Sequence, residues 1–316
     1  MKDKISVCCL CYNHDSYLYL AIESFFKQKG NFDIEIVIFD DHSTDKSRDI
    51  INEFENRYPN SMKVIFAEEN IYSQGRTAFF DIINASSGKY LAFCEGDDYW
   101  IDDYKLQKQL DYLKSNQDLN LVFHPSLTLT ELDGFVDKSY GNYGKFCSRH
   151  SFEDILSMSG GYMPMASIFA RRSAFDKWLK TYPDFFSKNM WHSTIQILGS
   201  YKVGCGYLPE VMSIYRSMHP GSWTHNITTS AESGIRDYLA FVSRNRGLRQ
   251  IIDVEFNHIF DRVLVKRSFK LSKSRLLKFK QKKDILRNIP FEFTLYHKVK
   301  MLTYMVVAEI LKYVKR

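Results

Sequence analysis

Short apolar runs alternate with longer amphipathic segments through the first 125 residues of the chain. Five runs have the length and composition of buried strands: residues 5–11, 34–39, 62–67, 90–94 and 119–124. The segments between them repeat apolar residues at helical spacing, over residues 16–27, 45–58, 73–85 and 103–115. Strands that alternate with helices predict an α/β fold, in which helices cover the faces of a mostly parallel sheet.

The pattern changes twice beyond this part of the chain. Residues 126–225 are less regular, with turn-rich stretches, three short helical patterns and two short extended pieces. After Pro220-Gly221 the pattern is mainly helical. The sequence therefore predicts two parts, an α/β domain over residues 1–225 and a helical C-terminal extension over residues 226–316.

The composition is that of an ordinary folded protein, since 45% of the 316 residues are hydrophobic and 25% are charged. This balance excludes a disordered or fibrous chain.

No apolar run approaches the roughly 18 residues that a bilayer-spanning helix needs, and residues 1–11 lack the apolar core of a signal peptide. The six cysteines include no Cys-x-x-Cys pair, which favours buried thiols over a metal site. We therefore expect a cytoplasmic protein.

Charge is divided unevenly along the chain. The net charge is +6, but residues 262–316 hold 16 Lys/Arg and 3 Asp/Glu, a local charge of +13, which leaves −7 for residues 1–261. Within residues 266–283 the cations are interleaved with Phe269, Leu271, Leu276, Leu277 and Phe279. This pattern favours basic helices on an anionic membrane surface, at the inner face of the plasma membrane. A merely solvated helical face is the alternative. Because no RNA- or DNA-binding motif accompanies the cations, we expect no nucleic-acid partner.

Carboxylates stand at the ends of two predicted strands. Asp40-Asp41 follows the second strand, and Glu95-Gly96-Asp97-Asp98 follows the fourth. In a parallel sheet, ligands gather at the carboxyl ends of the strands. Asp40-Asp41 could instead make turn and cap hydrogen bonds. Three carboxylates within four residues repel one another, and Mg²⁺ or Mn²⁺, which take oxygen ligands and complete their shells with phosphates, would relieve that repulsion.

Five motifs in order over about residues 4–225 resemble those of one enzyme family. They are the strand 7–11 with Tyr12-Asn13, the turn 39–45, Gly75-Arg76, the stretch 88–100 and the stretch 206–216. With these motifs the sequence resembles the inverting nucleotide-sugar glycosyltransferases of family 2, which have the glycosyltransferase A fold. The resemblance implies a catalytic domain over residues 1–225.

The resemblance also implies a nucleotide pocket. Asp41 is expected to contact the nucleotide base, which we expect to be uracil. Tyr12 and Asn13 are expected to line the same pocket, and Arg76 to support the base or the diphosphate. Asp98 and Trp100 are expected to border the sugar and the acceptor.

A metal site is implied by the same resemblance. Glu95-Gly96-Asp97 is similar to the family's Asp-x-Asp motif, with Glu95 in place of the first aspartate. Asp97 is therefore the first expected ligand of Mn²⁺ or Mg²⁺, and Glu95 is the second. His219 follows a Tyr-Arg pair with one residue more than the family's pattern has, and it is expected to reach the metal or the diphosphate.

The general base is where the sequence departs from the family. Members commonly carry an aspartate ahead of a tryptophan at a helix start, whereas Met190 stands ahead of Trp191 here. His192 is the first candidate, since the ordinary pKa of a histidine lies near working pH. Asp184 is the other candidate nearby, and Asp98, beside the metal motif, is the third catalytic candidate.

These features predict a metal-dependent enzyme that transfers a hexose or N-acetylhexosamine from a nucleotide donor, expected to be UDP. The acceptor is a hydroxyl of a glycan or of a lipid-linked glycan, as in bacterial capsule or O-antigen synthesis. A sugar-nucleotide pyrophosphorylase would need a glycine-rich loop after the first strand, and residues 11–15 contain no glycine. A non-catalytic subunit that binds nucleotide sugars within a polysaccharide-assembly complex stays open as the alternative.

Overall fold

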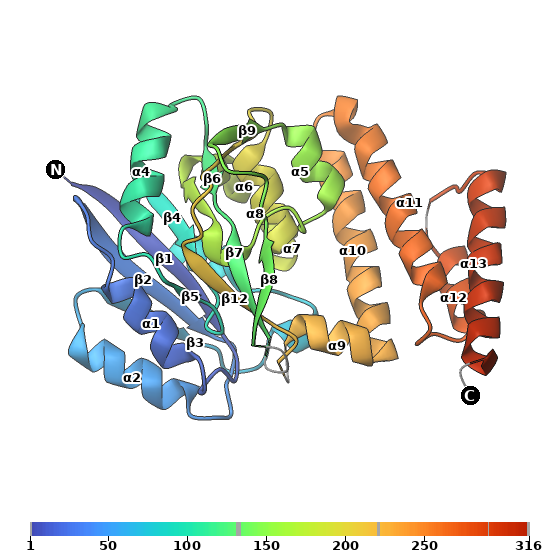
Figure 1. Ribbon diagram of the computed structural model, residues 1–316, viewed down its shortest axis with the longest axis horizontal. Coiled ribbons are helices and arrows are strands. Elements are labelled where there is room, and N and C mark those ends of the chain that lie inside the picture. Colours follow the sequence, from blue (N-terminus) through green and yellow to red (C-terminus); the bar gives the residue numbers. More distant parts are fainter. Residues whose placement is uncertain (1, 131–133, 220–221, 290, 315–316) are drawn as a thin grey trace. The chain divides into compact units, whose positions relative to one another are not determined.

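The computed structural model describes residues 2–130, 134–219, 222–289 and 291–314. These residues form two compact units, the first unit over residues 1–217 and the second unit over residues 218–316. The first unit contains the sheets, and the second unit is helical (Figure 1). The α/β prediction is thereby confirmed, whereas the assignment of catalysis to residues 1–225 stays a prediction.

An eight-stranded sheet organises the first unit, with the strand order β3-β2-β1-β4-β10-β6-β11-β9. Its strands are β1 (Asp3–Cys11), β2 (Phe32–Asp40), β3 (Met62–Phe66), β4 (Tyr90–Phe93), β6 (Leu121–Phe123), β9 (Ser148–His150), β10 (Phe169–Arg171) and β11 (Cys205–Tyr207). The first four strands of this order are parallel, as are β6 and β11. The antiparallel strand β10 separates these two parallel groups.

A second, four-stranded sheet has the order β5-β12-β7-β8. It consists of β5 (Tyr99–Trp100), β7 (Ser126–Thr130), β8 (Gly134–Tyr140) and β12 (Ser213–Ser217). Because β5 directly follows the acidic motif, this small sheet fixes the chain just after the strand end where the candidate site lies.

Helices cover both faces of the large sheet. The helices of the first unit are α1 (Leu18–Phe26), α2 (Ser47–Arg57), α3 (Phe79–Ala85), α4 (Lys105–Ser115), α5 (Phe152–Met158), α6 (Ser173–Thr181), α7 (Pro183–Asn189) and α8 (His192–Ser200), with short 3-10 turns η1 (Tyr72–Gln74) and η2 (Met165–Ser167). On one face, α1, α2 and α4 bury their apolar stripes against alternate residues of β1 and β2. On the other face, Phe79 of α3 and Phe175 of α6 pack edge-on against Phe93 of β4. Burial of these apolar side chains is the main force that holds the strand ends in place.

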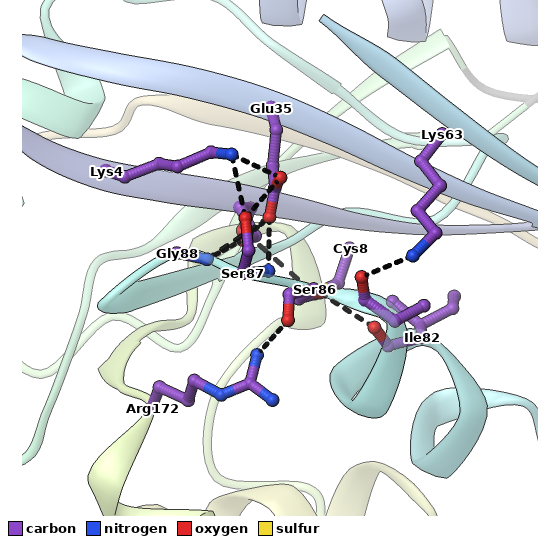
Figure 2. A network of polar contacts seen from close by, with 11 residues as sticks. Lys4, Cys8, Glu35, Lys63, Ile82, Ser86, Ser87, Gly88 and Arg172 are labelled. Carbon is purple, nitrogen blue, oxygen red and sulfur yellow. Dashed lines mark hydrogen bonds and ion pairs between the residues drawn. The ribbon is translucent and has the colours of Figure 1, made fainter.

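The amino-terminal end of the sheet is held by a polar network around Glu35 (Figure 2). The Glu35 carboxylate accepts hydrogen bonds from Lys4 Nζ, Ser6 Oγ and the backbone nitrogen and hydroxyl of Ser87. The backbone nitrogen of Gly88 donates to both Ser6 Oγ and Glu35 Oε1. Burial raises the pKa of Glu35, but these donors outweigh it and lower the pKa to about 2. The network therefore joins β1, β2 and the start of β4 around a fully compensated charge.

The second unit contains α9 (Trp223–Thr229), α10 (Ala231–Ile251), η3 (Val254–Phe256), α11 (Asn257–Lys273), α12 (Phe279–Arg287) and α13 (Leu295–Val314). Residues 266–283, expected to form basic helices, are divided between α11 and α12. α11 ends at Lys273, α12 begins at Phe279, and Leu271 and Leu277 are buried in the unit. No helix within the described residues is long and apolar enough to cross a membrane.

The thiols mostly follow the sequence expectation. Five of the six cysteines are buried, and Cys147 is exposed. Burial raises the pKa of Cys8 and of Cys11 to about 12, so these thiols behave as small apolar side chains.

Candidate active site

The turn after β2 gives its two aspartates different tasks. Asp40 is fully buried, and its carboxylate accepts from Arg48 Nε at 2.6 Å and from the backbone nitrogen of Ser43 at 3.1 Å. Asp40 therefore holds the turn itself, as the turn-and-cap interpretation had it. This leaves Asp41 as the residue of the pair that faces the next loop.

Asp41 fixes the loop that follows β3. Its two carboxylate oxygens accept from the backbone nitrogens of Ile71 at 2.7 Å and Tyr72 at 3.0 Å. Burial raises the pKa of Asp41, and the two backbone hydrogen bonds oppose that shift. The carboxylate thus lies at the strand end with one donor on each oxygen, which leaves further lone pairs for a ligand.

Tyr12 and Asn13 lie beside this turn. The backbone nitrogen of Asp41 donates to the Cys11 carbonyl, directly before Tyr12. Asn13 has a left-handed φ of 53°, and its Oδ1 accepts from the backbone nitrogen of Thr44 at 2.8 Å. The Tyr12 side chain is exposed. The structure therefore brings the three predicted base-pocket residues to adjacent strand ends of β1 and β2.

The acidic motif after β4 places its three carboxylates in different surroundings. Glu95 Oε1 lies 3.2 Å from His192 Nε2, and Asp97 Oδ2 lies 3.9 Å from His14 Nε2. Asp98 is buried and accepts from the backbone nitrogen of Arg216 at 2.8 Å. Burial, followed by the charges of Asp97 and Glu95, raises the pKa of Asp98 well above its usual range. The surroundings of Asp98 thus disfavour the charged form of its carboxyl.

The two nearby candidates for the base, His192 and Asp184, have different surroundings, and His192 lies next to the acidic motif. His192 is the first residue of α8, and its half-exposed ring stands edge-on to Phe79. Asp184 lies in the first turn of α7 with its side chain exposed. Met190 is fully buried, and its carbonyl accepts from Thr77 Oγ1. Of the residues near the expected base position, His192 is therefore the one whose side chain meets the acidic motif.

Arg76 and Trp100 make contacts within the protein. Arg76 Nε donates to the Ser187 carbonyl at 3.3 Å, which ties the loop after η1 to α7. Trp100 is buried, and its Nε1 donates to the Ala166 carbonyl at 2.9 Å. The Lys105 ammonium lies 4.1 Å from the centre of the Trp100 ring. Trp100 thus has the surroundings of a packing residue, and its contact with sugar stays a prediction.

His219 belongs to the second unit, where it is buried. Its carbonyl accepts from the backbone nitrogen of Ser222, which caps α9. The role of His219 toward a metal or a diphosphate stays a prediction. Within the described residues, no group of three His, Cys, Asp or Glu side chains is placed to hold a metal ion by itself.

Two residues of the site were not singled out from the sequence. His14 faces Asp97, and a Cβ at Gly96 would come within 2.9 Å of His14 Nδ1, so this position of the motif needs a glycine. The Arg216 guanidinium lies 4.8 Å from the ring of Tyr17 and 5.1 Å from that of Tyr99. His14 follows the end of β1, so the strand-end argument used for the aspartates could have found it. Arg216 is the last residue of the stretch 206–216, one of the five motifs that resemble the family.

The chain is similar in sequence to known proteins. The family model described as "Glycosyl transferase family 2" matches residues 6–175. An uncharacterized protein of Mycobacterium bovis is 31% identical over 224 residues, which are 69% of this chain and 60% of that protein. The Escherichia coli UDP-Glc:alpha-D-GlcNAc-diphosphoundecaprenol beta-1,3-glucosyltransferase WfaP is 29% identical over 49% of this chain and 61% of its own length. The chain thus spans less than two thirds of either relative.

Solved structures show the same fold at low identity. Staphylococcus aureus TarS 1–349 in complex with UDP has a TM-score of 0.56 and 15% identity, over 99% of this chain and 92% of that one. The mannosyltransferase PcManGT from Pyrobaculum calidifontis, in complex with GDP-Man and Mn²⁺, has a TM-score of 0.54 and 12% identity, over 98% and 87%. These likenesses show the glycosyltransferase A fold.

Proposed function

Because the chain belongs to glycosyl transferase family 2, we propose that it transfers a sugar from a UDP donor to a hydroxyl of a glycan or lipid-linked acceptor. The observation that carries this proposal is the cluster of Glu95, Asp97 and Asp98 at the carboxyl end of β4, in which burial and the neighbouring carboxylates raise the pKa of Asp98. A cluster of carboxylates that holds one strongly raised pKa is typical of a catalytic site. The UDP-Glc in the name of WfaP and the UDP in complex with TarS support UDP as the nucleotide.

We propose Asp97, with Glu95 beside it, as the protein's ligands for Mn²⁺ or Mg²⁺. Both side chains are partly exposed, so a cation can reach their oxygens. Because the described residues gather no third ligand there, the diphosphate would complete the coordination shell. When bound, the cation would neutralise the charge that develops on the leaving diphosphate.

The proposed reaction is a single displacement that inverts the anomeric carbon. The acceptor oxygen forms a bond to that carbon while the bond from the carbon to the diphosphate oxygen breaks, and UDP leaves with the electron pair. The His192 imidazole takes the proton of the acceptor hydroxyl, and Glu95 Oε1, 3.2 Å from Nε2, holds the ring beside the motif and stabilises its protonated form. Asp98 shapes the floor of the site through its hydrogen bond with the Arg216 backbone.

The name of a relative supports the class of acceptor, and the charge of the second unit supports a location. WfaP is named for a diphosphoundecaprenol acceptor, which supports a lipid-linked glycan in surface-polysaccharide synthesis for this chain too. The second unit carries 20 Lys/Arg and 8 Asp/Glu, a net charge of +12, whereas residues 1–217 carry −6. We therefore include in the proposal a peripheral location on the anionic inner face of the plasma membrane.

Turnover of a donor panel tests the proposal. The purified chain is incubated with Mn²⁺ and each of several UDP- and GDP-sugars, with and without lipid-linked glycan acceptors, and nucleotide release is measured. We expect release from a UDP-sugar that depends on acceptor and metal. Binding of UDP with no turnover across the panel would instead favour the non-catalytic subunit, to which the apolar Met190 at the expected base position lends support.

The His192→Gln variant tests the base. General-base catalysis raises a rate by about 10²–10⁴-fold, so the variant should be slower than the wild type by a factor of that size. Its rate should also no longer depend on the protonation of an imidazole. His258→Gln is the matched control, because His258 is exposed in the second unit and should leave the rate unchanged. An unaltered pH profile in His192→Gln would transfer the role to another residue.

A further inference from the structure

The helix α13 has two apolar faces. One face packs in the second unit through Met301, Met305 and Ala308, all of which are buried, and α11 is its main neighbour (Figure 1). The other face is exposed to solvent. It consists of Leu295, Tyr296, Val299, Leu302, Val306, Val307 and Ile310. Exposed side chains of this kind do not contribute to the core of the unit.

The spacing of the exposed residues places them on one continuous stripe. Leu295, Val299, Leu302, Val306 and Ile310 follow one another at intervals of three and four, which is the repeat of one helix face. Leu295 is 77% exposed, Val299 56% and Ile310 55%. Single exposed apolar residues are ordinary, but a contiguous apolar stripe of this length marks an interaction surface.

Cations flank the stripe. Lys298 is exposed, and the Lys300 ammonium lies 3.0 Å from the Tyr296 hydroxyl and 5.2 Å from the centre of the Phe269 ring. The Lys273 ammonium lies 4.3 Å from the Tyr304 ring of α13. Further exposed cations come from α11, α12 and the loop between them: Arg262, Lys266, Lys270, Arg275, Lys278, Lys280, Lys283 and Arg287. The apolar stripe is therefore carried by a strongly basic unit.

The apolar stripe and the cations around it together indicate which kind of surface could cover α13. A second copy of the chain would bring another unit of net charge +12 against the first, and like charges oppose that association. A neutral apolar partner would leave the surrounding cations without a role. An anionic bilayer offers both an acyl region for the stripe and phosphate groups for the cations.

We propose that α13 lies in the headgroup layer of an anionic membrane and inserts its exposed stripe between the lipids. This inference rests on the peripheral location proposed above and adds the surface that makes the contact. The sequence had assigned that contact to residues 266–283. In the folded unit those residues supply charge, while the apolar contact belongs to α13.

Vesicle binding of the full chain tests the inference. Sedimentation is measured with vesicles of phosphatidylglycerol and phosphatidylcholine, for the wild type and for the triple variant Val299→Gln, Leu302→Gln and Val306→Gln. The substituted side chains are exposed and glutamine favours helix, so folding should be unaffected. Loss of three inserted side chains should lower the partition coefficient by at least about 30-fold.

The matched control removes the same number of exposed apolar side chains elsewhere in the second unit, as Leu239→Gln, Val254→Gln and Leu276→Gln. We expect this control to bind within about twofold of the wild type. In 1 M salt, where the Debye length is about 3 Å, the wild type should retain more binding than the α13 variant. A Leu302→Trp chain should also show a blue shift of emission upon binding.

Each other outcome overturns part of the inference. Equal loss of binding in the variant and the control would show that α13 is not the inserting surface. A wild type that forms dimers without vesicles, with a monomeric α13 variant, would assign the stripe to a second copy. No vesicle binding by the wild type would overturn the peripheral location as well, while turnover of a UDP-sugar by the same sample would leave the transferase proposal intact.

Discussion

The pKa values of Glu35 and Asp98, at the two ends of the large sheet, are shifted in opposite directions. At the amino-terminal end, Glu35 is surrounded by donors from β1 and from the start of β4, and its pKa is lowered to about 2 despite its burial. At the carboxyl end, Asp98 is buried beside two further carboxylates, and its pKa is raised well above the usual range. One end holds its carboxylate in the charged form, and the other end disfavours the charged form of Asp98. The raised pKa, more than the number of carboxylates, supports the proposed site at the carboxyl end.

Among changes to the carboxylates at the two ends, the largest effect should come from Asp97→Asn at the carboxyl end. This change removes a ligand charge without altering volume, so sugar transfer should fall by about 10²–10³-fold while the circular dichroism and the melting temperature are kept. Turnover is measured against Mn²⁺ concentration. Full activity in this variant would contradict the metal assignment, and Asp111→Asn on the exposed side of α4 is the control.

Asp41→Ala should have the second-largest effect, a weaker binding of UDP in the nucleotide pocket. It removes the carboxylate that would contact the base and that holds the backbone of Ile71 and Tyr72. Hydrogen bonds to a charged group contribute about 1.5–3 kcal/mol, so UDP affinity should fall by about 10–100-fold. Calorimetric titration with UDP measures this, and an unchanged affinity would remove Asp41 from the pocket.

Glu35→Gln should lower stability without lowering the turnover of the folded protein. Loss of the charged acceptor should reduce the free energy of unfolding at pH 7 by about 1–2 kcal/mol. Because the pKa of Glu35 is lower in the folded than in the unfolded chain, its contribution is present above the unfolded pKa near 4.3 and is lost as pH falls toward about 2. Wild type and variant should therefore converge in acid. Glu23→Gln on the surface of α1 should change stability by less than about 1 kcal/mol.

Asp98→Asn should have the smallest effect and the opposite sign. The folded protein raises the pKa of Asp98, so the carboxyl destabilises the fold above the unfolded pKa near 3.9. An amide can still accept from the Arg216 backbone, so the free energy of unfolding at pH 7.5 should rise. The gain should vanish below pH 4. A loss of stability at pH 7.5, matching that of Glu35→Gln, would remove the contrast between the two ends.

Much of the sheet could be predicted because strands buried on both faces are continuous apolar runs. The runs that form β1, β2 and β4 carry this signal. Asp40-Asp41 stands at the end of β2, and the Glu95-Gly96-Asp97 motif follows β4. β10 gave no such signal, since it has three residues and its antiparallel place between β4 and β6 depends on pairing across the sheet. Local patterns do not encode contacts of that range.

The site was predictable in its residue types and less so in their surroundings. Asp97 and Asp98 are neighbours in sequence, yet Asp98 alone is buried, because the backbone of Arg216, 118 residues away, closes over it. The proximity of His192 and Glu95 likewise joins residues 97 apart. The exposed stripe of α13 could not be separated from its buried face, because both are apolar and the packing of α11 decides between them.

The position of β10 bears on how the chain folds as it leaves the ribosome. β3, β2, β1 and β4 pair among themselves, so this half of the sheet can assemble once about the first 93 residues have emerged. β6 follows soon in synthesis but has no place beside β4, because the intervening position is taken by residues 169–171. Until those residues emerge, the nascent chain presents the open hydrogen-bonding edge of β4, which is an aggregation hazard. The same delay applies to the hydrogen bond that Asp98 accepts from the Arg216 backbone, because it can form only after β12 has been synthesised.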